Sequence, residues 1–262
     1  MALTIALLLG SLGLLVWAFD DDSDEAKEAD SSDTETQRGD DGDDDLVGTD
    51  GMDALFGEGG DDLLAGEGGD DRLFGSDGVD AGLGGSGDDL VRGGADDDLL
   101  IGGEGSDDLR GDTGDDVLFS AEIVDETALL AILDGSDTTT PIEDTVDLTG
   151  ETNAAADTVN GGFGDDLLVL GAGDQATGGD GNDEYQLGSW IEPGDPATIT
   201  DFNIDEDVII YFFEGNTAPA ISVVSDDDGT ATVFADGEPF LIVPNAGDAF
   251  EDSTIQLEPL DI

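Results

Sequence analysis

The 262-residue chain contains no cysteine and no histidine, and only five of its residues are lysine or arginine. Without cysteine, its stability cannot depend on disulfides. Zinc and copper sites would lack their usual nitrogen and sulfur ligands, and the HExxH motif of metalloproteases is impossible. The scarcity of basic residues excludes nucleic acid as a partner, because phosphate binding requires patches of lysine and arginine.

The chain is instead rich in acid, with 68 aspartate and glutamate residues and a formal net charge of −63. Repulsion of this size opposes any compact state. The chain is therefore expected to be expanded unless something neutralises its carboxylates.

Aspartate recurs at every ninth position over one continuous stretch. The positions are Asp53, Asp62, Asp71, Asp80, Asp89, Asp98, Asp107 and Asp116. Glycine stands five residues before each of them, and leucine or valine stands two residues after each, with Gly82 as the exception. A nine-residue unit is too short for a helical repeat or a propeller blade, so each unit can form only one turn and one short strand.

The period also predicts how the units are arranged. If the middle residue of each three-residue strand points inward, two units make one coil, and aspartates eighteen residues apart lie along the same edge. Stacked coils are ~4.8 Å apart, and carboxylates that close repel one another unless they are neutralised. Carboxylates and glycine carbonyls are the oxygen ligands that Ca²⁺ prefers, whereas Mg²⁺ requires a tighter octahedron and retains its waters. The pattern therefore predicts several bound calcium ions.

These units resemble the GGxGxDxUx repeat of the RTX (repeats-in-toxin) proteins, in which U is a large apolar residue. Full matches begin at Gly84, Gly102, Gly161 and Gly178, and the resemblance covers residues 46–120 and 157–188. The regular leucine positions argue against a disordered glycine and aspartate tract. The resemblance implies a calcium β-roll in which turn carbonyls and the sixth-position aspartate bind the ion. In the full units these residues are Gly84, Gly85, Gly87, Gly102, Gly103, Gly105, Gly161, Gly162, Gly164, Gly178, Gly179 and Gly181, and in the second block the aspartates are Asp166 and Asp183.

The N-terminal part divides into two segments. Residues 1–19 include an uncharged apolar run, 3–19, which predicts a helix that is either a membrane anchor or a cleaved secretory signal, unless the run is buried or the start is spurious. Residues 20–45 are acidic with almost no apolar side chains, and we expect a disordered linker. The alternative is that Asp40 to Asp45 hold calcium loosely. Either reading of residues 3–19 places the acidic part across a membrane, on the cell surface or outside the cell.

After the repeats at 46–120, residues 121–156 are expected to form an insertion of one short helix, over 121–134, and a loop. A short second block of repeats follows at 157–188, in which Gln175 replaces an aspartate. Residues 189–262 contain apolar strands separated by Asp-Gly turns, which predict a capping antiparallel meander with a metal-independent core. The expected fold is all-β: a parallel β-roll (β-helix) of calcium-binding nonapeptide repeats, then a small antiparallel β-meander, with an N-terminal apolar helix.

The outward strand positions differ between the two expected sheets. One sheet presents Arg72, Arg92 and Arg110, and the other presents Leu63, Ala65, Ala81, Leu83, Leu99, Ile101, Val117 and Phe119. An apolar face in so charged a protein requires a cover, for which a helix near 123–133, the meander and a second copy of the chain are the candidates. The alternative is a face that is simply exposed. Gly82 is expected to leave a gap in the inner row of leucines and to mark the weakest coil.

Together these features predict an exported calcium-binding protein that folds on binding Ca²⁺ and has a structural or interaction role at the cell surface or in the medium. An enzyme is not expected, because an apolar segment and a linker are all that precede the repeats and no GxSxG motif occurs. The alternatives are an adhesive or surface-binding module that uses the apolar sheet, or a hydrolase fragment carrying an RTX secretion module.

Overall fold

The structure, a computed structural model, describes residues 34–121, 155–191, 194–247 and 250–260. The helix expected within residues 1–19 and the helix and loop expected over 121–156 fall almost entirely outside these ranges. Within the described ranges, no helix is long and apolar enough to cross a membrane.

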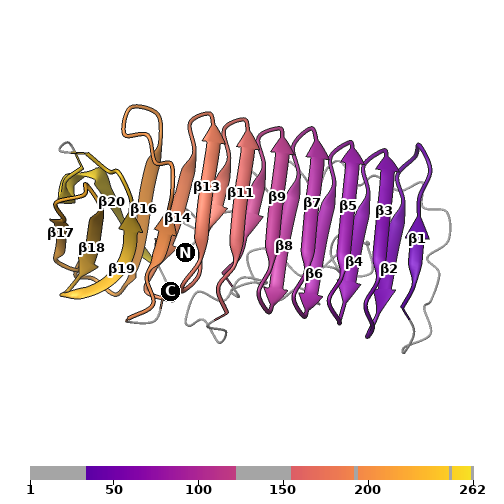
Figure 1. The fold of residues 1–262 in the computed structure, drawn as a ribbon, viewed down its shortest axis with the longest axis horizontal. Coiled ribbons are helices and arrows are strands. Elements are labelled where there is room, and N and C mark those ends of the chain that lie inside the picture. Colours follow the sequence, from indigo (N-terminus) through magenta and orange to yellow (C-terminus); the bar gives the residue numbers. More distant parts are fainter. Residues whose placement is uncertain (1–33, 122–154, 192–193, 248–249, 261–262) are drawn as a thin grey trace.

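The described chain is an elongated roll of two sheets (Figure 1). Sheet A has eleven strands in the order β1 (Thr36–Arg38), β3 (Ala54–Gly59), β5 (Arg72–Asp77), β7 (Leu90–Ala95), β9 (Asp108–Thr113), β11 (Thr158–Phe163), β13 (Gln175–Asp180), β15 (Ala197–Ile199), β19 (Glu238–Val243), β18 (Ala231–Ala235) and β17 (Ile221–Ser225). Sheet B has nine strands in the order β2 (Asp45–Thr49), β4 (Leu63–Glu67), β6 (Ala81–Ser86), β8 (Leu99–Glu104), β10 (Val117–Phe119), β12 (Leu167–Val169), β14 (Glu184–Gly188), β16 (Val208–Glu214) and β20 (Ile255–Leu260).

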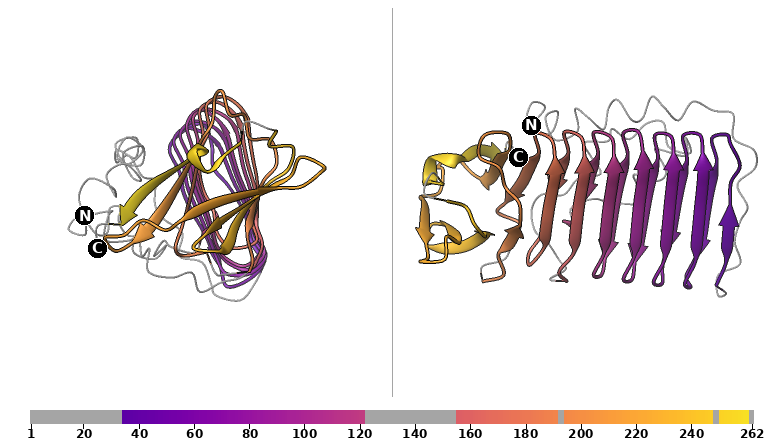
Figure 2. Two further views of the ribbon diagram at one scale, coloured as in Figure 1. Left: turned by 90° about the vertical axis from the view of Figure 1, so that its left-hand side faces the viewer. Right: turned by 45° about the horizontal axis from the view of Figure 1, so that its top comes forward.

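The register confirms that two repeats make one coil. Each repeat strand pairs in parallel with the strand one coil further on, so that Leu55 lies beside Leu73, and Leu73 beside Val91. The middle side chain of each strand points between the sheets and is buried. Viewed along the roll, the coils superpose as a narrow, flattened tube (Figure 2). The core is therefore two rows of aliphatic side chains facing each other.

Gly82 does not leave the expected gap in the inner row. A Cβ placed on Gly82 would lie 2.6 Å from Cγ1 of Val91, the inward side chain of the strand that follows it. Val91 is fully buried, so it already occupies the space that a larger residue at position 82 would need. The expectation of a gap at Gly82 was wrong, because a β-branched neighbour fills the space.

The roll begins earlier than the expected boundary at residue 46. Strand β1 lies within the segment expected to be a disordered linker, and it pairs in parallel with β3. Gln37 takes the inward position and donates a hydrogen bond through its side chain to the carbonyl of Val47. The nine-residue period extends back to Gly39 and Asp44, but a polar residue in the leucine position hides the first strand.

The C-terminal strands are only partly the expected meander. Strands β15, β16, β19 and β20 extend the parallel sheets of the roll. Among the described strands, only the pairs β17–β18 and β18–β19 are antiparallel. The two Asp-Gly turns are confirmed, with positive φ at Gly229 in the first and at Asp236 and Gly237 in the second. Parallel additions require long connections rather than tight turns, so local turn signals could not predict them.

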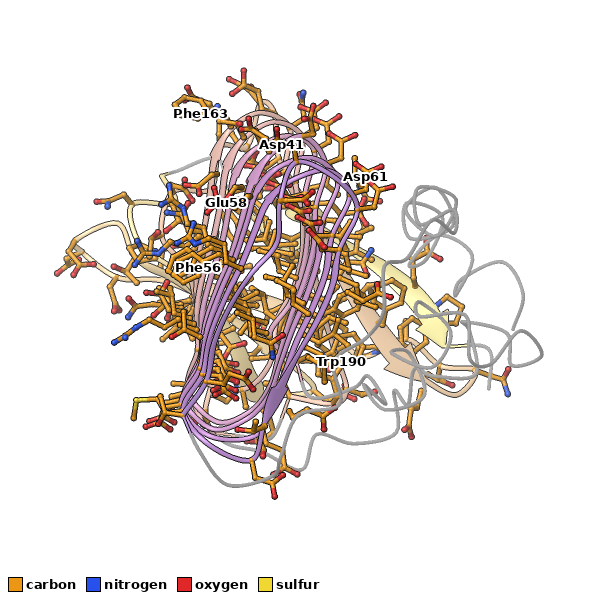
Figure 3. The ribbon with its side chains drawn as sticks, turned by 90° about the vertical axis from the view of Figure 1, so that its right-hand side faces the viewer. Asp41, Phe56, Glu58, Asp61, Phe163 and Trp190 are labelled. Atoms are coloured by element: carbon orange, nitrogen blue, oxygen red, sulfur yellow. The ribbon has the colours of Figure 1, made fainter. Side chains whose placement is uncertain are left out.

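The two outer faces differ as expected. On sheet A, Phe56 and Phe74 stack with ring centroids 5.1 Å apart, and Arg92 and Arg110 form ion pairs with Asp112 and Asp108 on the same outer face. Figure 3 shows this polar and aromatic face beside Phe56 and Glu58. On sheet B, the eight apolar outward side chains are exposed by no more than 3%. The alternative of a simply exposed apolar face is therefore excluded.

Candidate metal centre

The recurring aspartates lie in two continuous rows, one along each edge of the roll. In each row, the backbone amide of one aspartate donates a hydrogen bond of 2.7–3.1 Å to Oδ1 of the aspartate one coil further on. The first row is Asp53, Asp71, Asp89, Asp107, Asp157 and Asp174. The second row is Asp44, Asp62, Asp80, Asp98, Asp116, Asp166, Asp183 and Asp207.

The second carboxylate oxygen has no partner at most of the predicted positions. Among the described residues, Oδ2 is buried without a hydrogen bond in Asp62, Asp71, Asp80, Asp89, Asp98, Asp107, Asp116 and Asp166. Each of these side chains is exposed by no more than 3%. A buried, unpaired carboxylate oxygen is costly, so each position requires either a proton or a cation.

A glycine carbonyl from the next coil lies close to each of two such oxygens. A Cβ on Gly66 would lie 2.4 Å from Oδ2 of Asp71 and 2.4 Å from the carbonyl oxygen of Gly84. A Cβ on Gly84 would lie 2.6 Å from Oδ2 of Asp89 and 2.4 Å from the carbonyl oxygen of Gly102. The first glycine of each unit therefore allows the carboxylate oxygen and the glycine carbonyl oxygen to lie close to its Cα. Any side chain at this position would fill the space where these two oxygens converge.

The ligand set fits a hard cation. Among the described residues, no three acidic side chains converge on one point. Turn carbonyls would therefore have to complete the coordination around each carboxylate. Ca²⁺ accepts six to eight oxygen ligands in a flexible shell, including backbone carbonyls, and the residues present match that preference.

The other glycines of the full units are needed for their backbone conformation. Positive φ occurs at the second and fourth positions, at Gly85, Gly87, Gly103, Gly105, Gly162, Gly164, Gly179 and Gly181. In the degenerate units, non-glycine residues take up the same strained conformation, with φ of 82° at Glu58 and 77° at Asp112. The turn is therefore retained where the sequence match is lost.

Burial raises the pKa of nine of the predicted aspartates, and neighbouring carboxylates in the same row raise several of these values further. The hydrogen bond from the backbone amide acts in the opposite direction but is the weaker effect. Burial raises the pKa of Asp98 to about 9 and that of Asp116 to about 8. It raises the pKa to about 7 for Asp62, Asp71, Asp80, Asp107 and Asp166, and to about 6 for Asp89 and Asp183.

Asp53, at the start of its row, differs from the other predicted aspartates. Its Oδ2 accepts hydrogen bonds from the amide and the hydroxyl of Thr49. A threonine therefore satisfies the oxygen that has no partner in the eight aspartates named above.

Four members of the rows were not among the predicted ligands: Asp44, Asp157, Asp174 and Asp207. Asp174, and not Gln175, stands in the repeating position, because the unit is one residue shorter and Val159 pairs with Ala176. Oδ2 of Asp174 accepts hydrogen bonds from the hydroxyl of Ser120 and the amide of Gly171. A sequence signal for Asp157, Asp174 and Asp207 does exist: an apolar residue stands two positions after each of them. The structure buries these residues, Val159, Ala176 and Ile209.

The comparison with protein families agrees with this geometry. The RTX calcium-binding nonapeptide repeat family matches in four copies, at residues 38–73, 47–81, 83–118 and 149–174. Among solved structures, the extracellular lipase LipA from Serratia marcescens matches with 14% identity and a TM-score of 0.26, over 88% of this chain and 41% of the lipase chain. The chain thus spans less than half of that lipase. A comparison with curated proteins gives no match. The chain carries RTX calcium-binding nonapeptide repeats, and these repeats bind Ca²⁺.

Proposed function

We propose that the chain is an exported calcium-binding scaffold whose roll folds when Ca²⁺ binds along its two edges. The observation that carries the proposal is the set of eight buried Oδ2 atoms without a hydrogen-bond partner. The ions would be held by the sixth-position aspartates and by the turn carbonyls of the neighbouring units. Each Ca²⁺ supplies two positive charges to carboxylates whose second oxygen has no hydrogen-bond partner.

Folding and binding are one process in this proposal. The formal net charge of −63 opposes compaction of the metal-free chain. A ligand site assembled from two coils does not exist in the unfolded chain, so the free energy of binding contributes directly to folding. The narrow leucine core then becomes stable only when the carboxylates are neutralised.

This coupling suits a protein that leaves the cell. Extracellular calcium modules commonly have a Kd of ~10⁻⁴–10⁻³ M, far above the calcium concentration of a cytosol. The chain would remain expanded during synthesis and export, and would fold on meeting millimolar calcium at the cell surface or in the medium. We propose a structural or interaction role there and no catalytic one, since the repeats are calcium-binding modules.

The apolar face of sheet B does not favour the alternative of an adhesive module. Its outward side chains are buried, so they are not available to contact a foreign surface.

The proposed function is tested by limited proteolysis and small-angle scattering of the full chain at two calcium concentrations. At the submicromolar calcium of a cytosol, we expect an expanded, protease-sensitive chain. At millimolar calcium, we expect a compact chain in which the repeats resist cleavage. Equal compactness and equal resistance at both concentrations would contradict the proposed cycle.

A further inference from the structure

The outer face of sheet B carries a continuous apolar surface. Its two outward rows run over β4, β6, β8, β10 and β12 and contain Leu63, Ala81, Leu99, Val117 and Leu167 in one row and Ala65, Leu83, Ile101, Phe119 and Val169 in the other. The first row ends in charge on both sides, at Asp45 on β2 and Glu184 on β14. We call these ten side chains the apolar face.

The apolar face is buried although no described strand lies over β4–β10. Each of these four strands contacts its neighbours in sheet B and the strands of sheet A that precede and follow it in the chain. The same side chains of β4, β6, β8 and β10 are nevertheless exposed by no more than 3%. This burial occurs within the single chain, so it requires a cover from another part of the same chain.

The dimensions of the apolar face are those of one helix. Five strands at ~4.8 Å spacing cover about 24 Å across the sheet, and the two outward residues of each strand are about 6.6 Å apart. A 17-residue α-helix is about 25 Å long and about 10 Å wide. The surface is one helix wide and one such helix long.

Residues 3–19 match this surface in length and in chemistry. They contain no charged residue in a chain with 68 acidic ones. Residues 20–35, which connect them to β1, can span about 50 Å when extended, about twice the length of the apolar face. We propose that residues 3–19 dock along the apolar face of sheet B. Docking buries both the apolar segment and the apolar face, and it keeps the segment away from a membrane for as long as it lasts.

The absence of native cysteine makes the proposal directly testable by disulfide mapping. Single cysteines at Leu7, Leu8 and Leu9 are each combined with Ala81→Cys on β6, in the otherwise native full chain with saturating calcium and without lipid. We expect at least one of the three combinations to form an intramolecular disulfide in the monomer. The matched controls replace Ala81→Cys by Phe74→Cys, on the outer face of sheet A, and these should not cross-link.

Three outcomes would overturn the proposal. The first is cross-links that form only between chains, which would indicate that a second copy covers the face. The second is a cross-link of Ala81→Cys with Leu130→Cys and none with the N-terminal positions, which would indicate that the 122–154 segment is the cover. The third is no cross-link at all.

A second measurement does not depend on disulfide geometry. Deletion of residues 3–19 should make the thiol of the Ala81→Cys variant react with maleimide at least tenfold faster, while the calcium-dependent β signal is retained. An unchanged reaction rate in the folded deletion variant would show that residues 3–19 are not the cover. Loss of the calcium-dependent signal from the full chain itself would instead contradict the proposed function, so the two failures can be told apart.

Discussion

The repeats and the C-terminal strands continue the same two sheets but bury different chemistry. In the repeats, most strands contribute one aliphatic side chain to the core, and eight turns bury a carboxylate whose second oxygen has no partner among the described residues. In the C-terminal part, aromatic rings pack together, with Tyr211 and Phe240 at 4.4 Å and Phe202 and Phe250 at 5.6 Å between ring centroids. Acidic residues there include exposed turn positions such as Asp226 and Asp228.

The difference shows that one backbone architecture can be stabilised in two ways. A fully buried large apolar side chain contributes about 1.5–3 kcal/mol, and the C-terminal part contains several that meet in a continuous core. The repeats have a thinner core and carry buried charge, which opposes folding until it is neutralised. Their nine-residue period is the sequence requirement of the cation, and it disappears where hydrophobic burial takes over.

Removing calcium should therefore unfold the repeats while the C-terminal strands stay folded, and this is the largest effect we expect. In excess chelator, backbone amides of β3–β9 should exchange with deuterium as fast as in an unfolded chain. Amides of β17–β19 should keep most of their protection, because their core contains no metal-dependent element. Hydrogen–deuterium exchange with mass spectrometry measures both regions in one sample. Simultaneous loss of protection in both regions would contradict the claim that only the repeats depend on calcium.

Substituting a glycine that faces a carboxylate should damage the repeats without any change of charge. A Cβ in the Gly93→Ala variant would lie 2.0 Å from Oδ2 of Asp98, and we expect the calcium-loaded roll to lose about 1–3 kcal/mol of stability through overpacking. Gly59→Ala is the matched control on β3, since the nearest atom to its Cβ is 3.6 Å away. Thermal unfolding in saturating calcium compares the variants, and equal losses would refute the role of the close approach.

Replacing a buried aspartate by its isostere should have opposite effects with and without metal. Asp98→Asn removes the cost of protonating Asp98 when the metal-free chain folds, because the pKa of Asp98 is about 9 in the roll. The metal-free roll should therefore become more stable. It also removes a ligand charge, so the calcium midpoint should rise roughly tenfold or more. Asp97→Asn is the control, because the Asp97 side chain is exposed and accepts only a backbone hydrogen bond from Asp115. A calcium titration measures the midpoint of both variants. Equal shifts of the midpoint would show that the side chain at position 98 is not a ligand.

Acid should partly replace calcium, and this is the smallest effect we expect. The raised pKa values of about 9 for Asp98, about 8 for Asp116 and about 7 for Asp62 mean that the folded, metal-free roll binds protons more tightly than the unfolded chain. Stability from these groups is fully present below the unfolded pKa of ~3.9 and is lost as pH rises through the folded values, between about 6 and 9.

Far-UV circular dichroism of the metal-free chain across that range checks the sign of the effect. Ordinary exposed carboxylates have finished titrating by about pH 6, so they do not contribute within this window. A metal-free roll that gains β structure as pH rises from 6 to 9 would contradict the assignment of the buried carboxyls.

The period and the spacing of its residues were sufficient to predict the central part of the fold. Leu55 and Leu73 face inward, and Asp62 and Asp80 lie on one edge, because a nine-residue unit allows only one turn and one strand. The buried outer face of sheet B was also predictable, since Leu99 and Ile101 belong to rows without a polar residue.

The remaining features depend on contacts that a local pattern does not contain. Strand β1 was hidden because Gln37 replaces a leucine, and its burial depends on a hydrogen bond to Val47. Asp174 was missed because the unit is one residue short, and only the pairing of Val159 with Ala176 restores the register. The parallel addition of β19 to β15 joins residues about forty positions apart, beyond the reach of any turn signal.

The central claim is that the repeats fold as they bind calcium, and a calcium titration of the full chain tests it most directly. Far-UV circular dichroism at neutral pH should show a partial β signal in chelator, from the C-terminal strands. That signal should rise cooperatively as calcium reaches ~10⁻⁴–10⁻³ M, and equal concentrations of magnesium should leave it unchanged. A β signal in chelator that already equals the signal at saturating calcium would contradict the claim.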